Sequence, residues 1–246
     1  MVLAKNTVHI WEIDLEIFSS LELHVPAFLG DTEKDRAFQF RFQKDRDTFM
    51  VSRAALRILL GMYLDCSPTD LVFSYEKLGK PYLEHKIPIN FNVSHAGGKI
   101  LLGFGLDHPL GVDIEKINFD FDAMEIAENY FYGEEITALQ ALPSSRIHEG
   151  FFSLWTRKEA VIKYDGKGLS LPLDSFSVAL QPITPKNTTE VVWKPQWETE
   201  NKVYALKSME GYKAALAAHK SVKKIEVFEH RTTVSQLQDA IAKTKS

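Results

Sequence analysis

Three apolar segments that follow one another closely between residues 89 and 117 constrain the fold more than any other feature. They read INFNVSH, KILLGFGL and LGVDIEKI, and only AGG and DHP separate them. Alternating or continuous apolar residues bounded by Gly, Asp and Pro are typical of strands joined by tight turns. The three segments therefore predict an antiparallel meander, which needs helices to cover its apolar face.

Helical patterns surround this meander on both sides. Residues 31–64 begin with a charged stretch and continue with apolar residues at helical spacing. Residues 123–141 and 151–164 are also predicted to be helical, and four strand-like runs follow. A long helix and several strands thus occur twice. This predicts an α+β fold of two similar, pseudo-repeated halves, each a long helix packed on a small antiparallel sheet, with residues 1–108 in one half and 109–246 in the other.

Composition narrows the class of protein. The 246 residues are 45% hydrophobic and 25% charged, which is ordinary for a globular protein. A net charge of -4 argues against a dedicated nucleic-acid binder. The single cysteine, Cys66, excludes an intrachain disulfide and a thiolate zinc site. No signal-peptide core and no membrane-spanning run of roughly 18 apolar residues is found. We expect a cytoplasmic protein that is not in the membrane.

Two acidic residues lie on the last predicted strand. In LGVDIEKI the side chains of Asp113 and Glu115 project from one face, roughly 7 Å apart along the strand. One interpretation is a solvated strand face. The other is a divalent cation site, because two close carboxylates repel each other unless a cation or a shared proton compensates. An all-oxygen site suits Mg²⁺ or Mn²⁺ rather than zinc.

The helix written LWTRKEAVIKYDGKG from residue 154 carries charges on its apolar side. At 100° per residue, Lys158 falls in the middle of the apolar arc, Glu159 near its edge and Lys163 just beyond. Glu159 and Lys163 could form a surface i,i+4 pair worth about 0.3–0.5 kcal/mol, while Lys158 extends to water. Alternatively, Glu159 is a third metal ligand and Lys163 contacts an anion.

Further contacts with an anion are predicted elsewhere in the sequence, although a purely structural or solvated role is the alternative. Ser94 and His95 end a strand beside a glycine turn, where hydroxyl, imidazole and backbone N–H groups can donate to phosphate. The alternative, which a lone Ser-His pair favours, is a hydrogen-bonded turn. Lys80 lies in a Gly-Lys-Pro turn. Three more cations occupy the charged helical region, where a solvated face is the default: Lys34, Lys44 and Arg53.

Motifs that would supply a protein nucleophile or a nucleotide loop are absent from the sequence. There is no GxxxxGK[ST] loop, no HExxH pair and no GxSxG elbow. We therefore expect the attacking group to belong to a substrate.

Four segments in order resemble the Sfp-type 4′-phosphopantetheinyl transferases. That family carries (V/I)G(V/I)D and, some 40 residues later, (F/W)(S/C/T)xKE(A/S)xxK. The corresponding segments here are LGVDIE from residue 110 and WTRKEAVIK from residue 155. The segments GKP (79–81) and FNVSH (91–95) are also similar to family segments. The resemblance covers residues 31–180, and Thr156 is an accepted variant of the second motif.

The resemblance implies an activity and its ligands. The family transfers the phosphopantetheine arm of coenzyme A to a serine of a carrier protein, releases adenosine 3′,5′-bisphosphate and needs Mg²⁺. The implied metal ligands are Asp113, Glu115 and Glu159. Lys163 would contact the same phosphates. The other implied contacts of coenzyme A are Ser94, His95, Lys80, Lys34, Lys44 and Arg53.

The resemblance also implies a general base, a fold and partners. Glu135 lies where some members place an acidic residue proposed as the base, with Glu159 or a metal-bound water as alternatives. Coenzyme A would bind at the junction of two halves in a monomer, and the carrier would be an acyl, polyketide or peptidyl carrier protein. Two rival functions stay open: a non-catalytic module that binds coenzyme A or carriers, and a Mg²⁺-dependent phosphodiester hydrolase.

Overall fold

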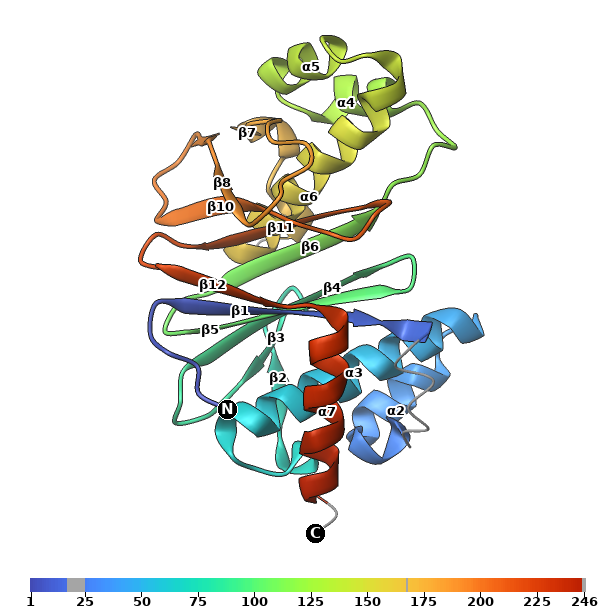
Figure 1. The fold of residues 1–246 in the computed structure, drawn as a ribbon, viewed down its shortest axis with the longest axis vertical. Coiled ribbons are helices and arrows are strands. Elements are labelled where there is room, and N and C mark those ends of the chain that lie inside the picture. The colour runs from blue at the N-terminus through green and yellow to red at the C-terminus, as the bar shows by residue number, and fades with distance from the viewer. Residues whose placement is uncertain (17–24, 167, 245–246) are drawn as a thin grey trace. The chain divides into compact units, whose positions relative to one another are not determined.

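The computed structural model describes residues 1–16, 25–166 and 168–244, and it has an α+β fold (Figure 1). The chain divides into two compact units, the first comprising Met1–Asp107 with Lys224–Ser246 and the second His108–Lys223. Each unit packs helices against one four-stranded sheet and adds a two-stranded one. The predicted α+β fold with a helix-and-sheet plan met twice is therefore confirmed.

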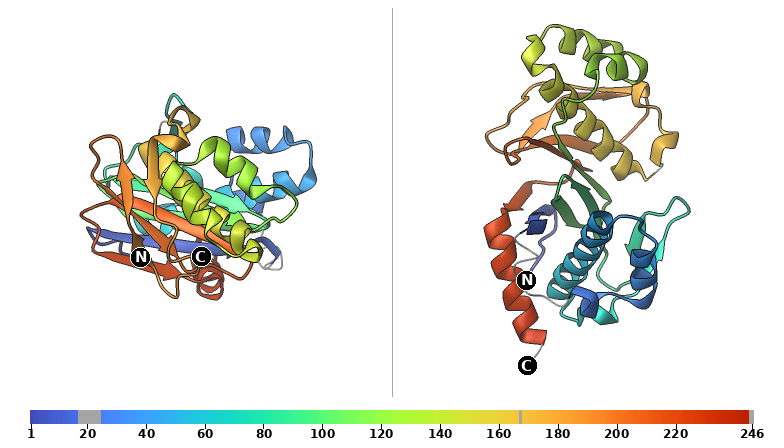
Figure 2. Two further views of the ribbon diagram at one scale, coloured as in Figure 1. Left: turned by 90° about the horizontal axis from the view of Figure 1, so that it is seen from above. Right: turned by 90° about the vertical axis from the view of Figure 1, so that its right-hand side faces the viewer.

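The first unit is a sheet with the strand order β12-β1-β5-β4, covered by α3 and α7 (Figures 1 and 2). Buried Trp11, Leu56 and Phe104 are part of the core between sheet and helices. The elements of this unit are β1 (Thr7–Asp14), α2 (Asp31–Phe38), α3 (Gln43–Leu64), β2 (Phe73–Tyr75), β3 (Pro81–Leu83), β4 (Ile89–Ala96), β5 (Lys99–Leu106), β12 (Lys224–Phe228) and α7 (His230–Thr244).

The predicted meander is correct for two of its three strands. β4 and β5 pair antiparallel through a turn at Gly97 and Gly98, both of which have positive φ angles. The next strand, β6 (Leu110–Lys116), does not pair with β5 but lies in the sheet of the second unit. Asp107 has a positive φ of 67° and ends the first segment of the first unit, so the short DHP segment connects the two units rather than forming a hairpin turn.

The second unit has the strand order β6-β11-β10-β8, with α6 packed across β6, β11 and β10 (Figure 1). Apolar residues on one side of α6, such as Phe151 and Leu154, fill the core together with Phe176 of β7. The elements are β6, α4 (Ala123–Tyr130), α5 (Gly133–Gln140), α6 (Ile147–Asp165), β7 (Phe176–Val178), β8 (Thr189–Val191), β9 (Trp193–Pro195), β10 (Asn201–Leu206) and β11 (Tyr212–His219).

The C-terminal segment belongs to a different unit from the one that the sequence predicted. Residues 224–246 were expected in the same half as 109–223, but β12 pairs in parallel with β1 of the first unit. Its sequence KIEVF is too short and too mixed in character to indicate a partner strand, and a parallel edge partner more than 200 residues away leaves no local pattern.

The long helical stretches are shorter than predicted. Residues 31–64 form two helices, and residues 123–141 form α4 and α5, which are separated by Phe131 and Tyr132. Among the described residues, no helix combines the length and the apolar character that a membrane crossing requires.

Candidate active site

The site in the second unit depends on a close approach between β6 and α6. A Cβ atom added to Gly111 would lie 2.1 Å from the carbonyl oxygen of Ala160 and 2.4 Å from the backbone nitrogen of Tyr164. Both distances are far shorter than any real contact, and both neighbours are backbone atoms of a helix. Only glycine at this position lets the strand lie directly against the helix.

Three carboxylates near this contact influence one another electrostatically, and we call Asp113, Glu115 and Glu159 the carboxylate cluster. Asp113 is buried at 2% exposure, while the two glutamates are half-buried. The half-buried Lys163 Nζ donates a hydrogen bond of 2.6 Å to Asp113 Oδ1. Lys163 therefore binds an acid on the neighbouring strand, and its charge also acts on Glu115 and Glu159.

The electrostatics of the cluster show mutual repulsion. Burial, followed by the charges of Asp113 and Glu159, raises the pKa of Glu115 to about 7, although Lys163 and a hydrogen bond from the Trp155 indole oppose this. Burial and the charge of Asp113 likewise raise the pKa of Glu159. One lysine thus compensates only part of the negative charge.

The donor chemistry of the cluster fits a divalent cation. When all three of its carboxylates are ionised, the cluster together with Lys163 carries a net charge of -2, and all the acidic donors are oxygen atoms, which suit Mg²⁺ or Mn²⁺. Within the ranges that the structure describes, no three His, Cys, Asp or Glu side chains already converge as metal ligands. A cation would therefore have to draw these side chains closer together.

Lys158 faces the protein interior, as the helical wheel predicted, but it does not extend to water. It is completely buried, and its Nζ contacts Glu135 Oε2 at 2.8 Å. The same Nζ donates to the carbonyl oxygens of Leu173 and Phe176 at 2.7 Å each. The ammonium also lies 4.3 Å from the centre of the Phe176 ring, within the range of a cation–π contact. We call Glu135 and Lys158 the buried pair.

Glu135 is buried and hydrogen-bonded within the protein, which is not the environment expected of a solvent-accessible base. It is 2% exposed, its Oε1 accepts from the Val178 backbone N–H at 2.7 Å, and its Oε2 accepts from that of Tyr132 at 2.9 Å. Both oxygens are therefore engaged. The sequence could not reveal this arrangement because the Lys158 partner lies on another helix.

Comparison with known proteins supports the predicted family. Residues 109–217 match the 4′-phosphopantetheinyl transferase superfamily, and residues 19–103 match the 4′-phosphopantetheinyl transferase N-terminal family. The 4′-phosphopantetheinyl transferase HetI of Nostoc is 32% identical over 197 residues, which cover 78% of this chain and 83% of that protein. The chain belongs to the Sfp-type 4′-phosphopantetheinyl transferase family.

Two further relatives extend the same result, and the family is one of enzymes. The 4′-phosphopantetheinyl transferase Sfp of Bacillus subtilis is 32% identical over 154 residues, covering 63% of this chain and 67% of its own. The 4′-phosphopantetheinyl transferase gsp of Aneurinibacillus migulanus is 31% identical over 207 residues, covering 83% and 80%. The superfamily match includes both β6 and α6, the two elements that carry the carboxylate cluster.

The family-implied residues of the first unit have mixed environments. Ser94 and His95 are consecutive on β4, so their side chains point to opposite faces of the strand, and Ser94 is buried while His95 is exposed. Lys80 precedes β3 in the turn of the β2–β3 hairpin. The side chains of Ser94 and His95 therefore face different surroundings.

Lys34, Lys44 and Arg53 were expected on a solvated helix face by default, and Arg53 is the one that does not lie there. Its Nε donates to Glu33 Oε1 at 2.5 Å, while Arg57 donates to Glu33 Oε2 at 2.6 Å. Its guanidinium lies 4.4 Å from the centre of the Phe73 ring. Arg53 is thus a buried ion-pair residue and not part of a solvated helix face. Lys34 pairs with Asp31 at 3.2 Å, and Lys44 is exposed near the start of α3.

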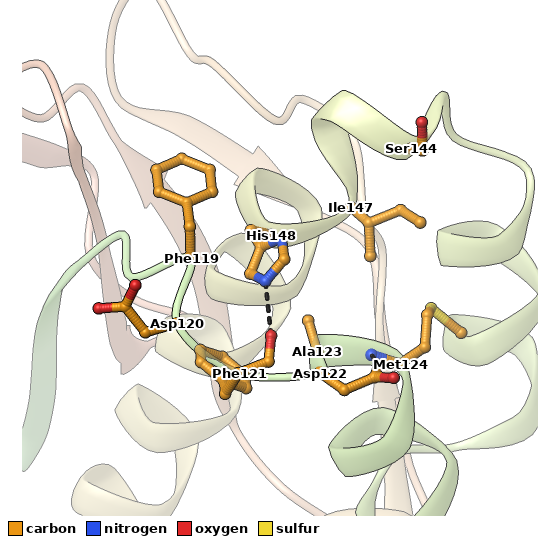
Figure 3. A pocket seen from close by; sticks show the side chains of 9 residues that line it. All are labelled: Phe119, Asp120, Phe121, Asp122, Ala123, Met124, Ser144, Ile147 and His148. Carbon is orange, nitrogen blue, oxygen red and sulfur yellow. Dashed lines mark hydrogen bonds between the residues drawn. The ribbon is translucent and has the colours of Figure 1, made fainter.

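A separate depression of about 450 Å³ lies where the segment after β6 meets the start of α6 (Figure 3). His148 Nε2 is 2.8 Å from the carbonyl oxygen of Phe121, which ties the two segments together. None of the family-implied site residues lines it. The lining residues are Phe119, Asp120, Phe121, Asp122, Ala123, Met124, Ser144, Ile147 and His148.

Proposed function

We propose that this protein transfers the 4′-phosphopantetheine group of coenzyme A to a serine hydroxyl of an apo acyl, polyketide or peptidyl carrier protein. Adenosine 3′,5′-bisphosphate is the second product. The observation that carries the proposal is the carboxylate cluster beside Lys163, held together by the β6–α6 contact at Gly111.

Asp113, Glu115 and Glu159 would hold Mg²⁺, or Mn²⁺ in its place. When bound, the cation supplies neutralisation of the diphosphate and of the charge that develops on the leaving bisphosphate. Phosphoryl chemistry depends mainly on positioning and charge neutralisation, so a site without a protein nucleophile is adequate.

The chain's own residues would do the rest. Lys163 Nζ, now donating to Asp113, is available to donate to a diphosphate oxygen once a cation satisfies that carboxylate. The serine oxygen attacks the phosphorus nearer the pantetheine, and the bond from that phosphorus to the bisphosphate breaks. The serine proton passes to a base. Glu159 is the best candidate among the side chains, because both oxygens of Glu135 are engaged in a buried network.

Lys80, Ser94 and His95 stay predicted contacts of coenzyme A, as do Lys34, Lys44 and Arg53. The cytoplasmic location and the monomeric state expected from the sequence also stay predictions, which cell fractionation and gel filtration would test.

One experiment tests the proposal. The protein is incubated with coenzyme A, Mg²⁺ and an apo carrier protein, and the carrier is weighed by mass spectrometry. A gain of the phosphopantetheine mass is expected. It should be absent with EDTA and absent with a carrier whose acceptor serine is replaced by alanine.

The variant Glu159→Gln should lose the activity, while Glu190→Gln is a matched control because Glu190 is an exposed partner of Lys202. Cleavage of coenzyme A without a gain in carrier mass would indicate a hydrolase instead. Binding of coenzyme A with neither reaction would indicate a non-catalytic module.

A further inference from the structure

The buried pair of Glu135 and Lys158 takes no part in the proposed chemistry, yet all three N–H donors of its lysine have acceptors. An ammonium has three N–H donors. Lys158 directs them at three acceptors: Glu135 Oε2 at 2.8 Å and the carbonyl oxygens of Leu173 and Phe176 at 2.7 Å. The aromatic rings of Phe176 and Phe131 enclose the ammonium further, at 4.3 and 5.6 Å.

These contacts tie α6 to two other elements. Glu135 is on α5, where it also accepts from the backbone at Tyr132, just before that helix begins. Its other oxygen accepts from Val178 of β7. One lysine on α6 therefore fixes the position of α5 and of the segment leading into β7.

Lys158 and Glu159 are consecutive on α6 and differ by 100° around its axis. On one side, Lys158 holds the helix through the buried pair. On another side, α6 contacts β6 so closely that Gly111 admits no Cβ atom. These two contacts at different angles restrict rotation of the helix about its axis, and the rotation of α6 sets the direction in which Glu159 and Lys163 point.

We infer that Glu135 and Lys158 are positioning residues, which set the rotation of α6 so that Glu159 and Lys163 meet the acids of β6, and that Glu135 is not the general base. This inference rests on the proposed function for its catalytic readout. Its structural readouts, stability and metal affinity, do not need that function.

The test compares Glu135→Gln, Lys158→Met and the double variant with the wild type. Glu134→Gln is the matched control, because Glu134 is the exposed neighbour on the same helix and pairs with Lys194 at the surface. Three quantities are measured: the urea midpoint of unfolding, the affinity for Mn²⁺ alone, and the pH profile of carrier modification with coenzyme A and Mg²⁺.

A positioning role predicts that each single variant binds Mn²⁺ about tenfold more weakly and unfolds at lower urea. The acid limb of the pH profile keeps its midpoint in Glu135→Gln, with a lower plateau. In the double variant the two losses are less than multiplicative, because each single variant leaves a buried partner uncompensated. The control matches the wild type in all three measurements.

Two results would overturn the inference. The first is a Glu135→Gln variant whose acid limb disappears while its Mn²⁺ affinity is unchanged, as expected for a base. The second is a double variant in which the single losses simply multiply. If Lys158→Met does not fold, the pH profile and Mn²⁺ affinity of Glu135→Gln decide alone. If the wild type modifies no carrier, the proposed function fails, and the Mn²⁺ and urea data still decide the positioning role.

Discussion

Helix α6 contributes residues to two clusters of acids and lysines. The two clusters have the same residue types but different environments. In the buried pair, one acid faces one lysine, both are almost completely inaccessible, and every hydrogen-bonding atom has a protein partner. In the carboxylate cluster, three acids share Lys163, and two of them, Glu115 and Glu159, are partly open to solvent. The buried pair is satisfied within the protein, whereas the carboxylate cluster retains negative charge that a ligand can neutralise.

The pKa shifts express the same difference. Burial raises the pKa of Glu135, but its partner Lys158 and two backbone hydrogen bonds, from Val178 and Tyr132, oppose that rise. At Glu115 burial is reinforced by the charges of neighbouring acids, and the pKa reaches about 7. Charge balance and access to solvent, rather than residue type, therefore distinguish the carboxylate cluster from the buried pair.

The largest effect on activity should come from the buried member of the carboxylate cluster. Asp113→Asn keeps the shape of the side chain but removes its charge and its pairing with Lys163. We expect carrier modification to fall by about 10²–10³-fold, as when a preorganised electrostatic group is removed. Circular dichroism should show a folded protein. Near-wild-type activity with Mg²⁺ would remove Asp113 from the site.

The contact that brings the carboxylate cluster together should dominate stability. Gly111→Ala places a methyl group 2.1 Å from a helix carbonyl oxygen, so the strand or the helix must shift. We expect a loss of about 3 kcal/mol in the free energy of unfolding, measured by urea titration. Gly133→Ala is the control, because a Cβ there meets no atom within 4 Å. Equal stabilities of the two variants would show that the β6–α6 contact is not tight.

Lys163→Met should act on phosphate handling more than on folding. The side chain is half-buried and exchanges a carboxylate partner for the diphosphate in the proposed reaction. We expect a higher Michaelis constant for coenzyme A and a transfer rate lower by about 10-fold or more, measured by steady-state kinetics. Unchanged kinetic constants would exclude a contact with the substrate.

A third acid–lysine pair extends the comparison to a partly exposed structural site. Burial alone would raise the pKa of Glu149, but hydrogen bonds from Lys213, Thr184 and Arg146 outweigh this effect and lower the pKa to about 2. A pKa below the unfolded value of 4.5 means that the ionised form stabilises the fold above pH 4.5. This stabilisation is lost as the pH falls toward 2.

The stability difference between the wild type and Glu149→Gln should therefore shrink between pH 4.5 and 2. Urea unfolding at several pH values measures it. A difference that is constant over that range would show that the Glu149 carboxylate keeps its ordinary pKa.

The sequence pattern predicted the features that depend on neighbouring residues, namely which face of a strand or helix a side chain occupies. The alternation in LGVDIEKI placed Asp113 and Glu115 on one face of a strand, and the helical wheel placed Lys158 inside and Glu159 at the edge. The β4–β5 hairpin followed from its glycine turn. The carboxylate cluster could be proposed because both of its elements carry strong, short-range signals.

Long-range pairing set the limits of that prediction. Nothing in the sequence around Leu110 indicates that β6 leaves the preceding hairpin to pair with β11, or that β12 returns to β1. The family resemblance suggested Glu135 as a candidate base, because some members place an acidic residue there, with Glu159 or a metal-bound water as alternatives. Its partner Lys158 is a contact between two helices, and only tertiary structure reveals it.

Two adjacent positions on α6 test the difference between the clusters most directly. Lys158→Met and Glu159→Gln are compared by urea unfolding without divalent cations and by carrier mass spectrometry with coenzyme A and Mg²⁺. We expect Lys158→Met to lose about 3–5 kcal/mol of unfolding free energy, because it leaves a buried carboxylate unpaired. Glu159→Gln should lose carrier modification while its unfolding free energy stays equal or rises, since one of three repelling charges is removed. A Glu159→Gln variant that modifies the carrier at the wild-type rate, or a Lys158→Met variant as stable as the wild type, would contradict this division of roles.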